Sequence, residues 1–372
     1  MKPEQTVTPV TIPEEILQRV EARGINRRDF IKFCTATTAA LALPITMLPK
    51  VAAAVEDKRP PVIWVEYQSC SGDSEAFLRA NQPTAAEIIL DLISLEYSEV
   101  VMAAAGHQAE QAKHQAMEKY KGQYILIVEG SVPTGADGAY CTVGGESAVD
   151  SCKKLVQNAA ATICVGSCAA FGGIPAAAPN PTNAVAVMDL VPGAAIVNLP
   201  GCPVNADNLT ATIVHFLTFG RLPATDRLRR PLFGYGKRIH DNCERRGHFD
   251  AGQYAEAFGD SAHRQGHCLY KLGCKGPETF HNCPTIRYNE GTSWPVMAGH
   301  GCIGCSEPGF WDTMTPFYRR LPKVPGFGVE ATADKIGIGL AAATAVAFGI
   351  HGVASCFRKG DAMEEDKVVR ED

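Results

Sequence analysis

The 372-residue sequence lacks a charge excess of either sign, because 35 Lys and Arg residues face 40 Asp and Glu residues for a net charge of −5. This balance excludes a protein that binds nucleic acid mainly by electrostatic attraction. The chain also lacks the cysteine density of a disulfide scaffold, since its 14 cysteines are about 3.8% of the residues and such scaffolds hold about 8–10%. No complete G-x-G-x-x-G motif or P-loop follows the first predicted strand, which weakens a nucleotide-binding interpretation.

The composition that is present is that of a folded protein. Hydrophobic residues make up 46% of the chain, and the length allows two or three domains with a substantial core. Fourteen cysteines are nevertheless too many for an ordinary cytosolic enzyme, so they require a chemical explanation.

Residues 1–54 have the pattern of a twin-arginine export signal. Arg27 and Arg28 precede the uncharged stretch 33–49, and Ala52-Ala53-Ala54 then offers a small-residue cleavage site. The alternative is the basic start of an ordinary buried helix. We expect residues 1–54 to lie outside the fold. Because the twin-arginine route carries folded proteins, metal centres can be built before export, and the cysteines need not form disulfides.

Residues 331–372 are predicted to form a membrane anchor and a short tail. Residues 336–357 carry no formal charge and, at about 1.5 Å per residue, are long enough to cross about 30 Å of hydrocarbon. The alternative is a buried core helix rich in Ala and Gly. Arg358 and Lys359 follow, which places the C-terminus in the cytoplasm and the body outside. His351 lies within the span, and both a contact with a partner's haem and a hydrogen bond to a neighbouring helix are open roles for it.

Residues 55–225 alternate predicted strands and helices. The strands are 62–66, 124–128, 162–165 and 195–199, and helical patterns occupy 84–93, 109–121, 146–160 and 205–218. This alternation predicts an α/β fold with a parallel sheet covered on both faces, specifically a flavodoxin-like doubly wound domain.

Three cysteines of this domain stand just beyond predicted strands, namely Cys70, Cys168 and Cys202. Loops that follow parallel strands open at one edge of the sheet, so the three thiols should converge there. Nearby glycines allow the close backbone approach that a bulky inorganic cluster needs. One such cysteine would be an ordinary packing residue, but three at equivalent strand ends indicate a metal site.

Residues 226–330 lose the regular alternation and gather potential metal ligands. His240, Cys243, Cys268 and Cys274 offer one set, and Cys283, Cys302 and Cys305 offer another. Either set alone could bind zinc, with His281 completing the second, and disulfides are a further alternative. Three separate sets of soft ligands along one chain instead favour iron-sulfur clusters arranged as an electron relay.

Taken together, these features resemble the small, electron-transferring subunit of membrane-bound nickel-iron uptake hydrogenases. The resemblance covers the export signal, residues 61–318 and the anchor, and it is most specific at 239–243, 248–252, 268–278 and 299–305. It implies a proximal 4Fe-4S cluster on Cys70, Cys168 and Cys202, a distal 4Fe-4S cluster on His240, Cys243, Cys268 and Cys274, and a medial 3Fe-4S cluster on Cys283, Cys302 and Cys305. Pro295 would lie near the place of a missing fourth medial ligand.

The first loop departs from the family pattern. Where the family has Glu-Cys-x-Gly-Cys-x-Glu, residues 69–75 place Asp73 at the second cysteine. We predict that Asp73 is the fourth proximal ligand, although carboxylate is harder than thiolate. The alternatives are a three-iron cluster without Asp73, or ligation by Ser71 or Ser74. Glu75 keeps the family's carboxylate, either for proton transfer or as a surface salt bridge.

Two further positions bear on oxygen tolerance. Oxygen-tolerant relatives often carry two extra proximal cysteines, which Gly72 and Gly173 replace here. Their specialised cluster is therefore not expected, and Asp73 could confer tolerance in another way, as a ligand that shifts on oxidation.

The resemblance also implies a function and a location. A separate large subunit would split hydrogen at a nickel-iron centre, and this chain would pass the electrons to a membrane cytochrome b or another quinone-reducing partner. It lacks the paired C-x-x-C motifs near both termini that the nickel-binding subunit has, so it should be inactive alone. The expected location is the periplasmic side of the inner membrane. A zinc-stabilised binding module, a flavin enzyme and a soluble sensory subunit are the alternatives.

Five cysteines belong to none of the three sets. Cys152 and Cys164 are interpreted as packing residues, Cys34 lies in the export signal, Cys356 lies in the anchor, and Cys141 has no assigned role.

Overall fold

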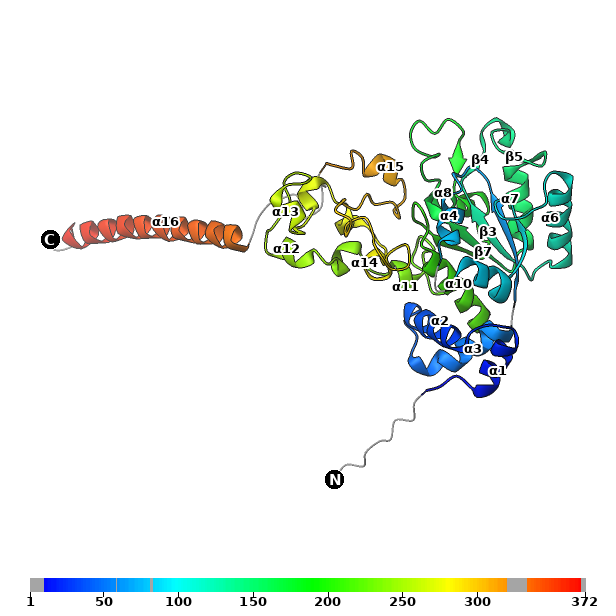
Figure 1. Ribbon diagram of the computed structural model, residues 1–372. Coiled ribbons are helices and arrows are strands. Elements are labelled where there is room, and N and C mark those ends of the chain that lie inside the picture. Colours follow the sequence, from blue (N-terminus) through cyan, green and yellow to red (C-terminus); the bar gives the residue numbers. More distant parts are fainter. Residues whose placement is uncertain (1–9, 58, 81–82, 320–332, 369–372) are drawn as a thin grey trace, which may run out of the picture.

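A five-stranded parallel sheet organises the larger domain. The computed structural model describes residues 10–57, 59–80, 83–319 and 333–368. Its strands lie in the order β2 (Ser94–Ser98), β1 (Pro61–Glu66), β3 (Ile125–Glu129), β7 (Ala161–Val165) and β9 (Ile196–Leu199). All neighbours pair in parallel, and the order 2-1-3-4-5 of the sheet strands is that of a flavodoxin-like fold (Figure 1). The predicted fold class is therefore confirmed.

The sheet is buried on both faces. Alternate strand residues point in opposite directions, so one strand contributes side chains to both faces. Ile125 and Ile127 of β3 join one apolar cluster, whereas Leu126 and Val128 join the other. Helices of the first face are α4 (Gly72–Leu78), α5 (Ala85–Glu87), the π-helix η2 (Ile88–Leu92) and α10 (Ala206–Phe219). Those of the second face are α6 (His107–Lys119), α7 (Ala148–Asn158) and α9 (Val187–Leu190). Cys152 and Cys164 are fully buried in the second cluster, as packing residues would be.

Smaller elements decorate the carboxyl edge of the sheet. They are β4 (Val132–Pro133), η3 (Gly135–Gly138), β5 (Thr142–Val143), β6 (Glu146–Ser147), α8 (Gly166–Phe171) and β8 (Ala184–Val185). The pairs β4–β8 and β5–β6 are short antiparallel ladders.

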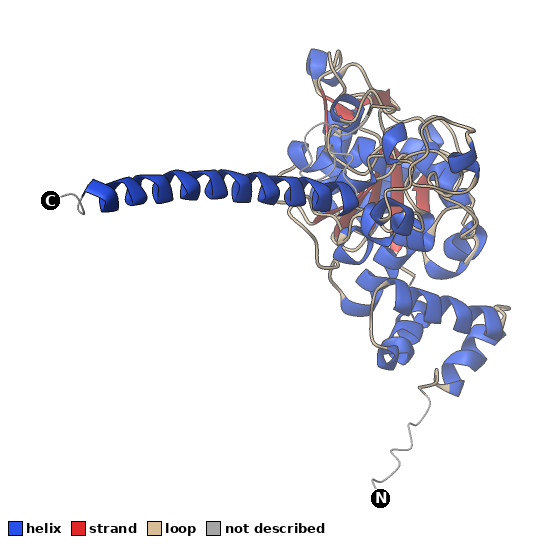
Figure 2. Ribbon diagram, turned by 90° about the vertical axis from the view of Figure 1, so that its left-hand side faces the viewer, coloured by secondary structure: helices blue, strands red, loops and turns tan. Residues whose placement is uncertain are grey.

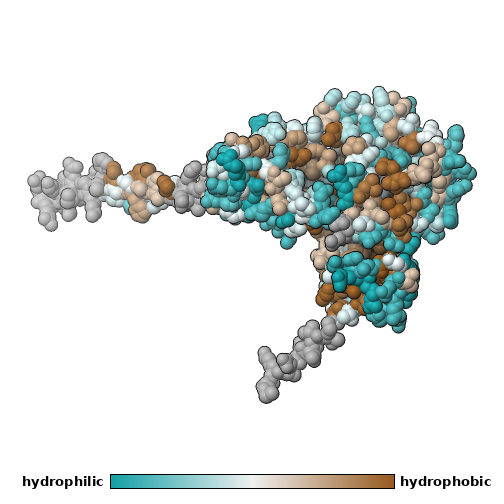
Figure 3. Space-filling view, viewed as in Figure 1, coloured by the Kyte–Doolittle hydropathy of each residue, from teal (hydrophilic) through white to brown (hydrophobic). Residues whose placement is uncertain are grey.

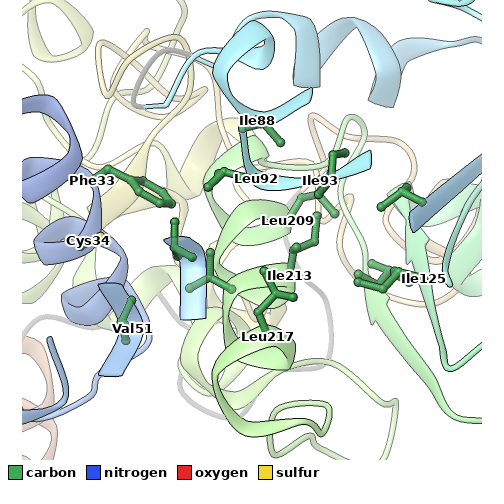
Figure 4. Packing of buried hydrophobic residues seen from close by; sticks show 14 of the residues in the cluster. Phe33, Cys34, Val51, Ile88, Leu92, Ile93, Ile125, Leu209, Ile213 and Leu217 are labelled. Carbon is green, nitrogen blue, oxygen red and sulfur yellow. The ribbon is translucent and has the colours of Figure 1, made fainter. Parts of the chain in front are cut away.

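An N-terminal segment (residues 10–57) is helical and packs on the body. It contains α1 (Glu14–Ala22), α2 (Arg27–Ala40), η1 (Ile45–Met47) and α3 (Leu48–Asp57). Asn26 caps α2 by accepting a hydrogen bond from the Arg28 backbone N–H at 2.9 Å. Phe33, Cys34 and Val51 belong to the same buried cluster as Leu209, Ile213 and Leu217 of α10 (Figure 4). The residues expected to lie outside the fold thus contact it.

The smaller domain consists of short turns of helix joined by long loops (Figure 2). Its elements are α11 (Leu232–Tyr235), η4 (Ile239–Asn242), α12 (Arg246–Asp250), α13 (Ser261–Arg264), η5 (Tyr270–Leu272), η6 (Gly276–Glu278), α14 (Cys283–Ile286) and α15 (Phe310–Thr313). Cys268, Cys283 and Cys302 are buried within its two small apolar clusters. A domain with so little regular structure gains stability when metal joins its loops.

The last helix, α16 (Ala333–Val368), contains a stretch suited to a membrane. Residues 338–355 have a mean hydropathy of 1.6, and none of this stretch is buried. The described part of α16 shows a largely apolar surface (Figure 3). By length and composition, this helix can cross a bilayer.

Candidate metal centres

The first cysteine set lies at the carboxyl edge of the sheet. Cys70 follows β1, Cys168 lies in α8 directly after β7, and Cys202 follows β9. Burial raises the pKa of the Cys202 thiol, and the neighbouring thiols of Cys305, Cys168 and Cys70 raise it further. The structure therefore brings the three strand-end cysteines together, at the edge where such folds bind ligands.

Asp73 is buried between the loops that carry these cysteines. Its Oδ1 accepts a hydrogen bond of 2.6 Å from the backbone N–H of Val204, two residues after Cys202. A Cβ at Gly166 would lie 1.9 Å from Asp73 Oδ2, and Gly166 has a φ of +76°, so only glycine fits there. Burial, then the charge of Glu129, raise the pKa of Asp73 to about 7.

The two serines that could replace Asp73 as ligands bind other groups. Ser71 Oγ donates to Glu66 Oε2 at 2.8 Å. Ser74 Oγ donates to Glu129 Oε2 at 2.6 Å and lies 3.0 Å from Glu66 Oε1. Their hydroxyls thus bind the carboxylates of Glu66 and Glu129, and these contacts support the loop that carries Cys70 and Asp73.

Glu129 is a supporting residue that the sequence analysis missed. It ends β3, is completely buried, and accepts the backbone N–H groups of Asp73 and Ser74 at 3.0 Å each. Its carboxylate also accepts from Ser69 Oγ at 3.0 Å and from Trp64 Nε1 at 3.3 Å. In the sequence, Glu129 stands directly after the apolar run of a predicted strand, and this position was the signal that could have identified it. Its partners lie more than 50 residues away, which no local pattern reveals.

The second set surrounds one small cavity in the smaller domain. His240, Cys243, Cys268 and Cys274 all line it. Burial lowers the pKa of His240 to about 4, which leaves a neutral imidazole suited to a metal. The backbone N–H of Arg245 donates to Cys243 Sγ at 3.4 Å, and that of Cys302 donates to Cys274 Sγ at 3.3 Å.

The third set lines a larger cavity of about 800 Å³ together with Pro295. Cys283, Cys302 and Cys305 supply the thiols, and Pro295 offers no side-chain donor. Gly304 donates its backbone N–H to Cys302 Sγ at 3.4 Å. His281 Nδ1 lies 2.9 Å from Cys283 Sγ, so His281 contacts a candidate ligand and belongs to its immediate surroundings.

The donor sets suit clusters better than single ions. Among the described residues, no three His, Cys, Asp or Glu side chains converge as a single metal ion requires. The described cysteines are also free of disulfides. Clusters spread their ligands over several irons, and hydrogen bonds to sulfur tune them. Soft ligands, buried thiols and backbone N–H···S contacts together fit iron-sulfur clusters.

The three sets contact one another in the order first, third, second. Ser167, beside Cys168, donates its hydroxyl to the Cys305 carbonyl and accepts the Gly201 N–H at 3.0 Å. The Cys302–Cys274 contact then joins the third set to the second. Arg230 binds both Asp226 and Glu307 at 2.9 Å, and Glu307 lies two residues after Cys305 of the third set.

Two other predicted residues have simpler surroundings. Glu75 is exposed and forms a salt bridge of 2.6 Å with Arg79. His351 lies on α16 and is exposed in the described structure.

Comparison with known proteins gives the family. The family model for the C-terminal part of the NiFe/NiFeSe hydrogenase small subunit matches residues 235–318, and that for the 20 Kd subunit of NADH ubiquinone oxidoreductase matches residues 70–216. The chain is 50% identical to the quinone-reactive Ni/Fe-hydrogenase small chain of Wolinella succinogenes, over 91% of this chain and 98% of that protein. It is 48% identical to the uptake hydrogenase small subunit of Azotobacter vinelandii, over 91% and 94% of the two chains.

Solved structures agree with this relationship. A [NiFeSe]-hydrogenase chain from Dm. baculatum superimposes with a TM-score of 0.67 and 38% identity, covering 71% of this chain and all of that one. An actinobacterial-type NiFe-hydrogenase chain of Ralstonia eutropha H16 gives a TM-score of 0.67 at 26% identity, over 78% and 91%. The chain belongs to the family of nickel-iron hydrogenase small subunits, which form an oxidoreductase complex with a large subunit that carries the nickel-iron site.

Proposed function

We propose that this chain carries electrons from hydrogen oxidation in the large subunit to a quinone-reducing partner in the membrane. Cys70, Asp73, Cys168 and Cys202 would hold a proximal 4Fe-4S cluster. His240, Cys243, Cys268 and Cys274 would hold a distal 4Fe-4S cluster, and Cys283, Cys302 and Cys305 a medial 3Fe-4S cluster. When bound, these clusters supply reversible one-electron transfer.

The observation that carries the proposal is the direct contact between consecutive ligand sets. Cys305 of the medial set lies beside Cys202 of the proximal set, and its carbonyl binds Ser167 next to Cys168. On the other side, the backbone of medial Cys302 donates to distal Cys274. A protein that used each site only for stability would have no need to place the three sites next to one another in a spatial series.

The chain's own groups set the properties of the relay. Backbone N–H groups directed at Cys243, Cys274 and Cys302 stabilise negative charge on sulfur. Burial raises the pKa of the Cys268 thiol to about 12, so its thiolate depends on a bound cation. These two effects together couple metal binding to the folding of the smaller domain.

Asp73 is the best-supported fourth proximal ligand among the three candidates. Its carboxylate lies between the loops of Cys168 and Cys202, and it contributes to raising the pKa of both thiols. Ser71 and Ser74 are each hydrogen-bonded to a glutamate instead. With a carboxylate ligand, one iron of this cluster would receive less electron density than it would from a thiolate ligand.

The location follows from the two ends of the chain. The twin arginines and the small-residue site at 52–54 support export by the twin-arginine pathway, and α16 supports anchoring in the inner membrane. The body would then face the periplasm, with the C-terminus in the cytoplasm. The quinone-reactive relative supports a membrane cytochrome b or similar quinone-reducing partner.

The test separates electron transfer from hydrogen chemistry. In the anaerobically purified complex, Cys268→Ala should abolish hydrogen-driven quinone reduction but leave hydrogen–deuterium exchange at the large subunit intact. The matched control is Cys152→Ala, since Cys152 is also buried but belongs to no ligand set. Unchanged quinone reduction in the Cys268→Ala complex would refute the relay.

A further inference from the structure

An imidazole lies against one thiol of the third ligand set. His281 Nδ1 is 2.9 Å from Cys283 Sγ, whereas the backbone N–H groups that reach Cys243, Cys274 and Cys302 do so at 3.3 to 3.4 Å. His281 is only 1% exposed and lines the cavity of about 800 Å³ together with Cys283. The ring is therefore placed to act on this sulfur through a hydrogen bond.

The chemistry of the sulfur decides which partner donates. A thiolate that ligates iron carries no proton, so Cys283 Sγ can only accept a hydrogen bond. The imidazole must then carry a hydrogen on Nδ1, and both a neutral and a protonated ring can do so. The direction of this hydrogen bond thus depends on the sulfur and not on the charge of the ring.

The other nitrogen of the ring does not explain why a histidine stands here. Within the described part of the chain, buried His281 Nε2 has no hydrogen-bond partner. A buried polar atom without a partner lowers stability, so an apolar side chain would suit a purely structural position better. The contact made by Nδ1 is the feature that only a donor can supply.

The chain holds His281 from both sides. The preceding residue, Phe280, donates its backbone N–H to Glu307 at 2.7 Å. The following residue, Asn282, exchanges two side-chain hydrogen bonds of 3.0 Å with Asn208 of α10. These contacts join three separate parts of the chain, so the protein itself fixes the backbone position of His281.

Tyr235 orients the imidazole ring. The two rings meet edge to face, with 4.9 Å between their centroids and 83° between their planes. Tyr235 is itself 1% exposed, and its hydroxyl donates to the Pro200 carbonyl at 2.8 Å. The backbone N–H of His281 donates to the Lys237 carbonyl at 3.2 Å. A ring held in this way keeps Nδ1 directed at Cys283.

A hydrogen bond at this position has a consequence for the relay. Hydrogen bonds to ligand sulfur raise a cluster's reduction potential, because they stabilise the negative charge that reduction adds. Asp73, as a less donating ligand than thiolate, would favour the reduced state of the proximal cluster. Such a cluster passes its electron on readily only when the potential of the next acceptor is raised as well.

We infer that His281 is a positioning residue that donates Nδ1–H to Cys283 and raises the reduction potential of the medial cluster. This inference rests on the proposed function, which supplies the clusters and their order. One electron moves, so that the proximal cluster is oxidised and the medial cluster is reduced, while the hydrogen stays on Nδ1. His281 thereby keeps the first transfer along the relay favourable.

Two substitutions separate the hydrogen bond from the packing. His281→Leu fills a similar volume without a donor, and it should lower the equilibrium constant for reduction of the medial cluster about tenfold, equivalent to about 59 mV for one electron. His281→Asn places an amide N–H where Nδ1 stands, and its equilibrium constant should stay within about threefold of the wild type. The measurement is an EPR-monitored redox titration of the anaerobically purified complex, with iron counted in each variant.

The control changes the same residue type away from the thiols of the third set. His215 of α10 is partly buried, and its Nδ1 lies 3.1 Å from the Arg221 carbonyl. His215→Leu should leave the medial potential unchanged.

A spectroscopic measurement on the wild type needs no variant. In a complex labelled with ¹⁵N-histidine, pulsed EPR of the oxidised three-iron cluster should show a weak coupling to an imidazole nitrogen, as expected across a hydrogen bond. A strong coupling would mean that His281 ligates iron, and the inference would be wrong.

The remaining outcomes separate the inference from the proposed function. A His281→Leu complex with full iron and the wild-type medial potential would overturn the inference alone. Loss of iron in both His281 variants, with an unchanged potential in the clusters that remain, would show a structural role and would also overturn it. A wild-type complex without a three-iron EPR signal would instead overturn the proposed medial cluster, and with it the proposed function.

Discussion

Replacing Glu129 with Gln should loosen the loop that carries Cys70 and Asp73. Five donors bind the Glu129 carboxylate, including two backbone N–H groups at 3.0 Å, and the Glu66 carboxylate lies beside it. Gln keeps one oxygen and adds an NH₂ group, which can donate to Glu66 but otherwise faces donors. Serine hydroxyls can rotate to accept from it, but a backbone N–H cannot, so either Asp73 or Ser74 is left with an unsatisfied N–H.

General magnitudes for buried hydrogen bonds give the size of this effect. An unsatisfied buried N–H costs about 1–3 kcal/mol, and each lost hydrogen bond to a charged group about 1.5–3 kcal/mol. Because the substitution also relieves the repulsion between this site and Glu66, we expect a net loss of about 1–3 kcal/mol in unfolding free energy, measured by chemical denaturation, together with a reduced iron content and a weakened proximal-cluster EPR signal. Glu118→Gln, on the exposed face of α6, is the matched control and should stay within about 0.5 kcal/mol of the wild type. A Glu129→Gln protein with wild-type stability and full iron would refute the reasoning.

Three further predictions concern other parts of the chain. Asp73→Ala should remove the iron atom that Asp73 would hold and so lower the iron content of the proximal cluster. Asp73→Cys should restore that iron with an altered EPR signal. Identical spectra for wild type and Asp73→Cys would exclude ligation by Asp73. Burial raises the pKa of Glu99 from 4.5 to about 7, so the folded state holds this proton more tightly, and stability should fall as pH rises from about 4.5 to 7. Glu99→Gln should remove that dependence, worth at most about 3 kcal/mol in denaturation at pH 5 and 8, and an unchanged dependence would contradict the assignment. Arg230→Met should cost about 3–5 kcal/mol, because Glu307 would keep a buried charge without its partner; denaturation that matches the wild type would argue against this.

The sheet was predictable where its strands are buried on both faces. β1, β3, β7 and β9 are nearly continuous apolar runs, and their predicted bounds agree with the structure to within one residue. The edge strand β2 escaped prediction because Ser94-Leu95-Glu96-Tyr97-Ser98 has only two apolar side chains. A polar edge strand has little local pattern to distinguish it from a loop.

The candidate site was predictable only in its ligands. Cysteines placed after parallel strands must converge, and Cys70, Cys168 and Cys202 do so. Which groups support them depends on contacts across long sequence separations. Glu129 and Asp73 are 56 residues apart, and the N-terminal segment meets α10 across about 160 residues. Neither contact leaves a periodic trace in the sequence.

Iron and acid-labile sulfide per chain, measured with EPR on the anaerobically purified complex, test the central claim most directly. The account predicts two four-iron clusters and one three-iron cluster in the small subunit, all of them reducible by hydrogen. A colourless small subunit that contains zinc in place of iron, or one with fewer clusters that still delivers electrons to quinone at full rate, would contradict it.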